Sequence, residues 1–584
     1  MAQTECKFYP TVGEFPLQEY PRPQFARTDW ICLNGKYEFA ITGSKDRPAA
    51  FDSEILVPFS PEYRLSGVEK HPIADDQMWY RRTFTVPAAW SGKRVILNFG
   101  AVDYTCEVFV NGLSVGTHTG GYLPFGFDIT DFLADGENEL VVRANDPTDR
   151  GGQPRGKQAT NSHGFWYKAN SGIWQTVWLE PVSAAHLECV KMTPDIYSQT
   201  LTVAAQIPAG CELSAVITDA EGNSVADAVL TGEDTLPVKS PRLWSPEDPY
   251  LYNIVFTLKQ DGAVVDTVSS YFGMRDYALK KDIHGFMRLC LNGKPYFQSG
   301  LLDQGYWFDS GLTPPTEEAM VYDIQKMKDM GFNMLRKHIK VEPLRWYYLC
   351  DKMGMLVWQD MVSGGPYESN ILVGVLPNMN IRRIDDTAKN YKLFKRDNAE
   401  DRAEFKRELN EMIDVLYNST SICCWVPFNE GWGQFDALEV GLWTKEKDPS
   451  RFVDHASGWH DQGGPDFVSI HKYVLPVRAP KQDPNRPFVL SEFGGYSLIL
   501  DEHVWNKKKS FGYMMYKSQE SLTAAVKKLY EKQIIPLLKK GLSATVYTQV
   551  SDVEAEVNGL LTYDRKIVKV DEQTMREINA KLKY

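Results

Sequence analysis

The chain has 584 residues, of which 64 are Lys or Arg and 76 are Asp or Glu, so its formal net charge is −12. This length exceeds what one hydrophobic core organises and predicts several domains. The negative charge and the lack of a basic block exclude a protein that binds the phosphate backbone of nucleic acids, because such binding needs clustered Lys and Arg. No run of about 18 apolar residues occurs, so we expect neither a transmembrane helix nor a membrane partner.

The first residues, MAQTECKFYPTVGEF, lack the basic start and the apolar stretch of a signal peptide. The nine cysteines are scattered without metal-ligand spacing, and Cys423 and Cys424 are adjacent within an apolar run. Buried thiols in a reducing compartment explain this pattern best. We therefore expect a cytoplasmic protein, although a mature form of an exported protein has the same features.

Residues 1–182 consist of short apolar or alternating runs that turns interrupt, such as WYRRTFTV, KRVILNFG and YTCEVFVNG. Two turn dipeptides, Asn111-Gly112 and Asp135-Gly136, join such runs. No strong helical periodicity is present, so this region predicts an antiparallel, jelly-roll-like β-sandwich.

Residues 183–273 form a second series of strand-like runs, including TLTVAAQI and YNIVFTLKQDGAVVDTV. A length of about 90 residues and the spacing of the turns are typical of an immunoglobulin-like sandwich. Cys189 and Cys211 do not have the disulfide spacing of that fold, so we expect a sandwich without a bridge.

From residue 274 to residue 584, strand-like runs alternate with helical stretches such as TEEAMVYDIQKMKDMGF and DRAEFKRELNEMIDVLYNS. Eight runs qualify as strands: PYFQSGLL, NMLRKH, MLVWQDM, ICCWVPFNE, RFVDHAS, FVSIHKY, PFVLSEF and SATVYTQV. Alternating strands and helices of this number predict a (β/α)8 TIM barrel. The Lys-rich segment from Trp505 to Gly541 is expected to be helical, with a solvated charged face.

Two of these runs end in a glutamate that glycine follows closely, Glu430 in the fourth and Glu492 in the seventh. A carboxylate at such a place projects into a cavity, because burial in a packed barrel costs too much desolvation energy. The C-terminal ends of barrel strands meet around one pocket. Two carboxyl groups there are what glycoside hydrolysis needs, one to protonate the leaving oxygen and one to attack the anomeric carbon.

Other polar residues stand at predicted strand ends, and Asp303 and His338 are the preferred readers of sugar hydroxyls, with Trp459 as a further pocket residue. His338, Asp360 and His471 lie on three separate strands without a short ligand motif. We therefore predict no metal site and no cofactor.

The chain resembles glycoside hydrolase family 2, which includes β-galactosidases, β-glucuronidases and β-mannosidases, within the clan of retaining (β/α)8 enzymes. The matching motifs are MWYRRTFTVP, GGYLPFGFDIT and SGIWQTVWLEP before the barrel, and NMLRKH, PFNEGWG and LSEFGGY within it. The resemblance covers essentially the whole chain and implies the same three domains.

The resemblance also implies roles for five residues. Glu430 is expected to be the general acid/base and Glu492 the nucleophile. Asn429 is expected to bind the sugar 2-hydroxyl, Arg336 to hold Glu492 ionised, and Tyr473 to donate its hydroxyl to Glu492. A Trp-rich shell of Trp425 and Trp432 is expected near the acid/base, where it raises the carboxyl pKa.

Some positions depart from the family pattern. Where β-glucuronidases carry an Asn-x-Lys pair for the substrate carboxylate, this chain has Glu556-Val557-Asn558. Near the usual Trp platform of the eighth strand it has Tyr547, and its second strand reads RKHIK. Because an acidic Glu556 would repel a uronate, we expect a neutral terminal sugar.

The favoured activity is that of an exo-acting, retaining β-galactosidase with a carbohydrate substrate. A furanosidase (β-galactofuranosidase or α-L-arabinofuranosidase) and a β-mannosidase are the alternatives within the family. An inactive carbohydrate-binding protein is the alternative outside the enzymes, although pure binding needs no carboxylate pair. Assembly of a homo-oligomer through the sandwiches is compatible with the enzyme interpretation.

Overall fold

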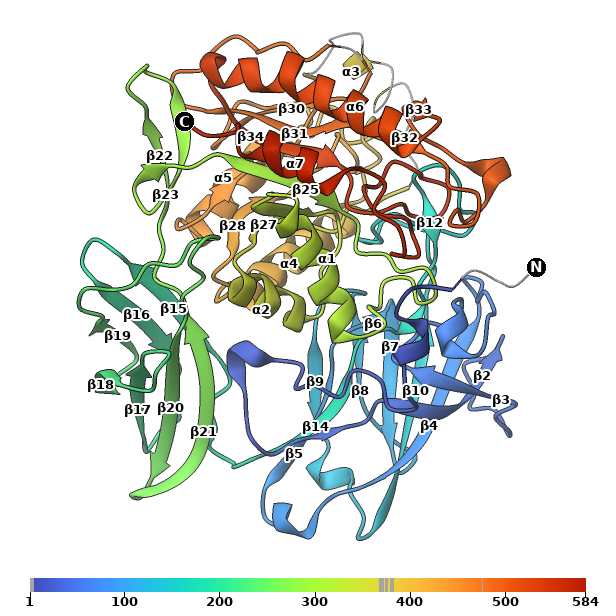
Figure 1. Cartoon of the computed structure of the whole chain (residues 1–584). Coiled ribbons are helices and arrows are strands. Elements are labelled where there is room, and N and C mark those ends of the chain that lie inside the picture. Colours follow the sequence, from blue (N-terminus) through green and yellow to red (C-terminus); the bar gives the residue numbers. More distant parts are fainter. Residues whose placement is uncertain (1–4, 367–371, 373–375, 379–382, 475) are drawn as a thin grey trace.

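The computed structural model describes residues 5–366, 372, 376–378, 383–474 and 476–584. Figure 1 shows two β-sandwiches side by side and, above them, an α/β domain that contains the C-terminal half of the chain. None of the helices in the described part of the chain has both the length and the apolar character needed to span a bilayer.

The first sandwich has a six-stranded and a four-stranded sheet. Its alternating sequence explains this arrangement, since every second residue of a strand faces the other sheet. Asn111-Gly112 forms the predicted tight turn, with φ values of 51° and 81°. The strands of the larger sheet, in spatial order, are β3 (Ser53–Val57), β2 (Gly35–Thr42), β4 (Gln77–Thr85), β10 (Glu137–Asn145), β7 (Thr105–Val110) and β8 (Leu113–Thr119). Those of the smaller sheet are β1 (Ile31–Cys32), β14 (Val177–Val182), β5 (Arg94–Phe99) and β9 (Phe125–Asp128).

The second sandwich has a three-stranded and a four-stranded sheet around its own hydrophobic core. Cys189 and Cys211 are both free thiols, as expected from their spacing. The smaller sheet contains β15 (Val190–Asp195), β16 (Thr200–Ala205) and β19 (Glu233–Pro237). The larger sheet contains β18 (Ser224–Leu230), β17 (Cys211–Thr218), β20 (Tyr252–Gln260) and β21 (Ala263–Phe272).

The α/β domain contains a curled sheet of eight parallel strands, and each strand corresponds to one of the eight predicted runs. The first and last strands of this sheet approach each other where the Ser457 and Ser469 hydroxyls lie 3.5 Å apart. The structure therefore has the predicted TIM-barrel topology. In spatial order the strands are β29 (Phe452–Val453), β28 (Ile422–Val426), β27 (Leu356–Asp360), β26 (Met334–Lys337), β25 (Gln298–Asp303), β34 (Leu542–Thr548), β31 (Phe488–Gly494) and β30 (Val468–Lys472).

Helices cover the barrel, and their termini have the sequence signals expected of helices. Thr316 caps α1 by accepting a hydrogen bond from the Ala319 amide, and Asn398 caps α4 through the Glu400 amide. The segment Trp505–Gly541 is α-helical only from Gln519 onward; before it lie a single 3-10 turn (Lys507–Lys509) and the strand β33 (Met514–Tyr516). The main helices are α1 (Glu317–Asp329), α2 (Leu344–Met353), α4 (Ala399–Leu416), α5 (Ala437–Lys447), α6 (Gln519–Leu529) and α7 (Glu572–Asn579).

A long loop of the first sandwich reaches the barrel and carries two short paired strands, β11 (Gln158–Ala159) and β12 (Tyr167–Lys168). Tyr167 of this loop and Trp174 just after it belong to the same hydrophobic cluster as the barrel residues. The first sandwich and the barrel thus share a core, which holds this loop against the C-terminal ends of the barrel strands.

Candidate active site

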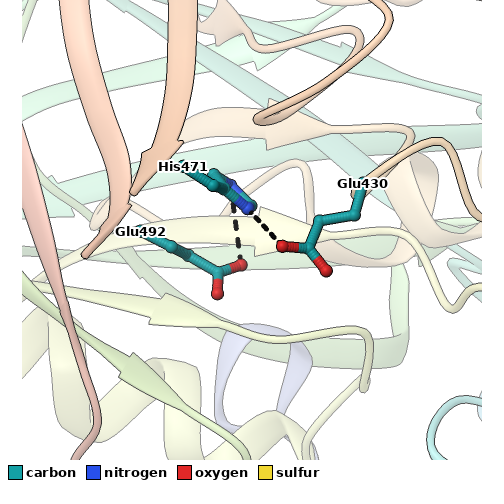
Figure 2. Close-up of side chains that lie close together, drawn as sticks. All are labelled: Glu430, His471 and Glu492. Carbon is teal, nitrogen blue, oxygen red and sulfur yellow. Dashed lines mark hydrogen bonds and ion pairs between the residues drawn. The ribbon is translucent and has the colours of Figure 1, made fainter. Parts of the chain in front are cut away.

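The two predicted carboxylates lie at the C-terminal side of the barrel sheet (Figure 2). Glu492 lies within β31, whereas Glu430 lies in the loop after β28, which ends at Val426. Our placement of Glu430 at the end of its strand is therefore wrong by four residues, from 426 to 430. Its φ of 54° and a hydrogen bond of 2.9 Å from its amide to the Ser457 carbonyl turn the side chain toward Glu492.

His471 of β30 lies between the two glutamates (Figure 2). Its Nδ1 is 2.8 Å from Glu430 Oε1, and its Nε2 is 3.6 Å from Glu492 Oε1. One nitrogen or oxygen from each of the three side chains falls within 4.8 Å of the others. The ring thus fixes the separation of the carboxylates. The sequence indicated His471 as a pocket residue but not as the link between the two glutamates.

Arg336 of β26 is fully buried and donates to Glu492, Asn429 and Asp360, and also to the Ser491 carbonyl at 3.1 Å. Its Nη1 donates to Glu492 Oε1 at 3.1 Å, and its Nη2 donates to Asn429 Oδ1 at 2.8 Å. Its Nε and Nη2 also donate to the two oxygens of Asp360 at 2.9 and 3.0 Å. The planar guanidinium fork suits such bidentate contacts, and it compensates the charge of buried carboxylates.

Tyr473 donates its hydroxyl proton to Glu492 Oε2, so each oxygen of Glu492 has a donor. The ring of Tyr473 stacks on Tyr513 with centroids 4.1 Å apart. Burial, followed by the charge of Glu492, raises the pKa of Tyr473 well above its ordinary value. The hydroxyl therefore keeps its proton at neutral pH and remains a donor.

Glu430 has different surroundings from Glu492. Burial raises the pKa of Glu430 to about 7, and Glu556 adds to that rise, while the positive charges of Lys157 and Arg336 oppose it. Its side chain is 27% exposed, compared with 4% for Glu492. A carboxyl group with a pKa near 7 can give up and take back a proton at neutral pH, as a general acid/base must.

Two of the other predicted pocket residues, His338 and Asp303, interact closely with charged side chains of the barrel. His338 Nδ1 lies 2.8 Å from Asp360 Oδ2, and burial, followed by Lys157, lowers the pKa of His338 well below its ordinary value. Asp303 is 4% exposed and accepts a hydrogen bond of 2.8 Å from Lys337 Nζ. Asp303 thus forms a buried ion pair, which corrects the expectation that it is free to read a sugar hydroxyl.

Of three further aromatic residues predicted near the pocket, one is partly exposed and two are fully buried. Trp459 is partly exposed beside His471, with ring centroids 6.1 Å apart. Tyr547 is fully buried in the hydrophobic core, and its hydroxyl accepts the Tyr496 amide, so it offers no face to a sugar. Trp425 is also fully buried and donates to Asp448 at 2.9 Å, so it is not part of a shell around Glu430.

The first sandwich adds residues that the sequence did not indicate. Trp166 makes an edge contact with Trp432, with centroids 4.6 Å apart, and Tyr167 donates its hydroxyl proton to Glu556. Lys157 lies near enough to Glu430 to lower the pKa of that carboxyl. No local motif marks these positions, because only the packing of the first sandwich on the barrel brings them to the site.

One ligand atom from each of Glu430, His471 and Glu492 lies within 4.8 Å of the others, so these three described side chains form a group that could hold a metal ion. A small cavity of about 40 Å³ between the first sandwich and the barrel has none of the predicted site residues in its lining.

Three family models match the chain. "Glycosyl hydrolases family 2, sugar binding domain" matches residues 65–180, and "Glycosyl hydrolases family 2" matches residues 185–275. "Glycosyl hydrolases family 2, TIM barrel domain" matches residues 283–580, which are 298 of the 584 residues.

The curated proteins similar to this chain include β-glucuronidases and β-galactosidases. A β-glucuronidase of Bacteroides fragilis is 26% identical over 494 residues, which cover 80% of this chain and 62% of that protein. A β-galactosidase of Vibrio cholerae is 25% identical over 575 residues, which cover 86% of this chain and 52% of that protein. The chain therefore spans less than two thirds of the length of these curated relatives.

Among solved structures, a β-glucuronidase from Ruminococcus gnavus in complex with D-glucuronic acid has a TM-score of 0.71 at 18% identity. The alignment covers 98% of this chain and 100% of that one, and at this identity it shows the shared fold alone. The barrel model alone matches more than half of the chain, and models for both sandwiches match beside it. The chain belongs to glycosyl hydrolase family 2.

Proposed function

We propose that this protein is an exo-acting, retaining β-glycosidase that works by double displacement. The observation that carries the proposal is the pair Glu430 and Glu492, whose nearest carboxylate oxygens lie within 4.8 Å. Retaining enzymes hold their two carboxyl groups about 5 to 5.5 Å apart, whereas inverting enzymes need about 6.5 to 9.5 Å to admit a water molecule. The shorter spacing supports retention.

In the first step, Glu492 attacks the anomeric carbon and forms an ester with it. The bond to the leaving oxygen breaks, and Glu430 gives that oxygen a proton. In the second step, ionised Glu430 takes a proton from a water molecule. The oxygen of that water attacks the anomeric carbon and displaces Glu492. The two inversions restore the original configuration of the sugar.

The surroundings of the two carboxyls support this division of labour. Glu492 accepts from Arg336 and Tyr473, which favours a nucleophile that carries negative charge. Glu430 has a pKa of about 7 because of its burial, which favours a group that exchanges a proton. The hydrogen bond from Arg336 to Asn429 Oδ1 leaves the Asn429 amide nitrogen as a donor, which supports a role for Asn429 in binding the 2-hydroxyl.

For the sugar itself we propose a neutral terminal residue, with a β-galactoside first. Support comes from Glu556, which stands where β-glucuronidases carry an Asn-x-Lys pair, and from the β-galactosidase name of the Vibrio cholerae relative. Glu556 is 3% exposed, with one oxygen accepting from Tyr167 and the other from Asn558. A furanosidase, a β-mannosidase and an inactive carbohydrate-binding protein remain the alternatives.

A β-glucuronide is the second candidate, and one observation favours it. The amine of Lys157 has no ion-pair partner among the described residues, although it lies near Glu430. The β-glucuronidase name of the Bacteroides fragilis relative agrees with this candidate.

A panel of para-nitrophenyl β-D-galactoside, β-D-glucuronide, β-D-mannoside, β-D-galactofuranoside and α-L-arabinofuranoside tests the proposal. We expect kcat/KM to be highest for the galactoside, and the first product seen by proton NMR to have the configuration of the substrate. Hydrolysis with initial formation of the opposite anomer would contradict double displacement. A higher kcat/KM for the glucuronide would replace the first candidate with the second.

A further inference from the structure

The backbone beside Lys157 is fixed to the rim of the barrel. The amides of Arg155 and Gly156 both donate to the Ser363 carbonyl, at 3.0 and 2.9 Å. Gly156 has a φ of 65°, and a Cβ atom there would lie 3.0 Å from the Ile339 carbonyl. Because Ser363 and Ile339 follow β27 and β26, this docking places Lys157 over the C-terminal ends of two barrel strands.

The Lys157 amine is flanked by aromatic rings, and no acidic group of the described residues is paired with it. It lies 5.7 Å from the Phe165 ring centroid and 5.6 Å from the Tyr167 ring centroid. Within the described residues it has neither a hydrogen-bond acceptor nor an ion-pair partner, and its side chain is partly exposed. An aromatic face holds a cation near a set position without neutralising its charge.

Other lysines near the same end of the barrel are different. Lys337 is paired with Asp303 and Glu342 at 2.8 and 2.7 Å. Lys340 is paired with Glu342 at 2.8 Å and donates to two carbonyl oxygens. Both of these lysines are buried and serve the barrel itself, so Lys157 is the one of the three that can offer its charge to a bound molecule.

Lys157 lies close enough to Glu430 and His338 for its charge to act on both. The Tyr167 ring beside its amine donates its hydroxyl proton to Glu556, which also acts on the charge of Glu430. Lys157 thus brings a positive charge to the pocket that contains Glu430, the group proposed to protonate the leaving oxygen.

We propose that Lys157 binds a carboxylate group of the substrate and is a specificity-determining residue contributed by the first sandwich. This inference rests on the proposed glycosidase function. The carboxylate belongs either to the terminal sugar, as in a β-glucuronide, or to the leaving group, as in a neutral sugar linked to a uronate. In both cases a partly desolvated charge pair forms between the amine and the carboxylate, which strongly favours the acidic substrate.

Two pairs of substrates distinguish a carboxylate on the terminal sugar from a carboxylate on the leaving group. The first pair is para-nitrophenyl β-D-glucuronide and β-D-glucoside, which differ by a carboxylate on the terminal sugar. The second pair is β-D-galactosyl-glucuronate and β-D-galactosyl-glucose with the same linkage, which differ in the leaving group. For one pair we expect the ratio of kcat/KM, acidic over neutral, to fall by about 30-fold or more in Lys157→Met.

Lys157→Arg retains the charge and is expected to restore most of that ratio. Lys36→Met is the matched control, since Lys36 is a surface lysine of the same sandwich with a 61% exposed side chain. We expect Lys36→Met to leave the ratio unchanged. In Lys157→Met, the kcat/KM of the acidic member is expected to fall much more than that of the neutral member, because only the acidic member loses a charge partner.

Calorimetric titration with D-glucuronate and D-glucose separates a failure of this inference from a failure of the proposed function. The wild type is expected to bind glucuronate more tightly than glucose, and Lys157→Met is expected to lose the difference even if no substrate is hydrolysed. An equal loss for acidic and neutral partners, or ratios unchanged in both pairs together with unchanged binding, would overturn the role of Lys157. Absence of hydrolysis with the binding difference intact would instead overturn the glycosidase function.

Discussion

The roles of the two glutamates follow from what each one contacts. Glu492 accepts from a buried arginine and a protonated tyrosine, whereas Glu430 contacts His471 and is more exposed. Identical side chains thus acquire different chemistry from their surroundings. Two predictions belong to this scale.

The variants Glu492→Ala and Glu430→Ala should fail in different ways. Without the nucleophile, turnover of every substrate should fall to background. Without the acid/base, kcat on poor leaving groups should fall by about 10²- to 10⁴-fold, and activated leaving groups should be affected less. Azide should partly restore Glu430→Ala by attacking the glycosyl-enzyme, and the β-glycosyl azide can be detected by mass spectrometry. Full activity of Glu430→Ala on an unactivated disaccharide would contradict the assignment.

The pH dependence of kcat/KM should report the pKa of Glu430. Since the acid/base must be protonated for the first step, activity on a neutral substrate should decline as the pH rises through about 7. Lys157 lowers this pKa, so Lys157→Met should move the alkaline limb to higher pH. His471, Arg336 and Glu556 also face Glu430, and they are unchanged in this variant. A limb that stays in place or moves to lower pH would show that Lys157 does not act on Glu430.

At the scale of elements, the loop of the first sandwich that carries β11 and β12 has the greatest effect on the site. Its docking depends on close backbone approach at Gly156, where a Cβ atom would lie 2.9 Å from the Tyr122 hydroxyl and 3.0 Å from the Ile339 carbonyl. The positive φ of 65° adds to this constraint, because residues with a Cβ rarely adopt it.

Gly156→Ala should therefore lower both activity and stability, because the loop must move to relieve the contact. Gly136→Ala is the matched control, since Gly136 also has a positive φ, of 89°, but nothing lies within 4 Å of its added Cβ. The control measures backbone strain alone, about 1 kcal/mol. We expect kcat/KM to fall at least tenfold in Gly156→Ala and to stay near wild type in Gly136→Ala. Equal effects in the two variants would show that the approach of the loop to the barrel is unimportant.

At the scale of the whole molecule, a buried charge cluster joins the two sandwiches. Arg27 donates to both oxygens of Asp266 at 3.0 and 2.8 Å, and it lies 3.3 Å from Glu180. Its side chain is 7% exposed. Because these three residues come from separate parts of the chain, the cluster fixes how one sandwich meets the other.

Arg27→Ala should leave Asp266 buried without its counter-charge and destabilise the protein by about 3 kcal/mol. Arg47→Ala removes an exposed pair with Glu139 in the first sandwich, where the Arg47 side chain is 43% exposed. That control should cost less than about 1 kcal/mol. Urea unfolding followed by tryptophan fluorescence compares the two variants, and a similar loss of stability in both would refute a structural role for the buried cluster.

Much of the architecture could be read from local patterns. The eight predicted strand runs all contain a strand of the barrel, because buried parallel strands are short, nearly continuous apolar runs. The turn at Asn111-Gly112 and the helices α1 and α4 also follow from neighbouring residues. The end-of-strand rule of barrels brought Glu430 and Glu492 to one pocket, although Glu430 lies in the loop four residues after its strand, and the family resemblance added Arg336.

By itself the sequence determined the barrel and the carboxylate pair, since each depends on periodicity or on position along a strand, whereas Arg336 as the cation beside Glu492 was implied by the family resemblance. Only the tertiary structure decided which polar residues remain available to a substrate. It paired Asp303 with Lys337, buried Tyr547 in the core, and brought Lys157 of another domain, which has no ion-pair partner among the described residues, near enough to Glu430 to act on its charge. The physical reason is that charge pairing and burial depend on the neighbours in space, and segments far apart in the chain supply those neighbours.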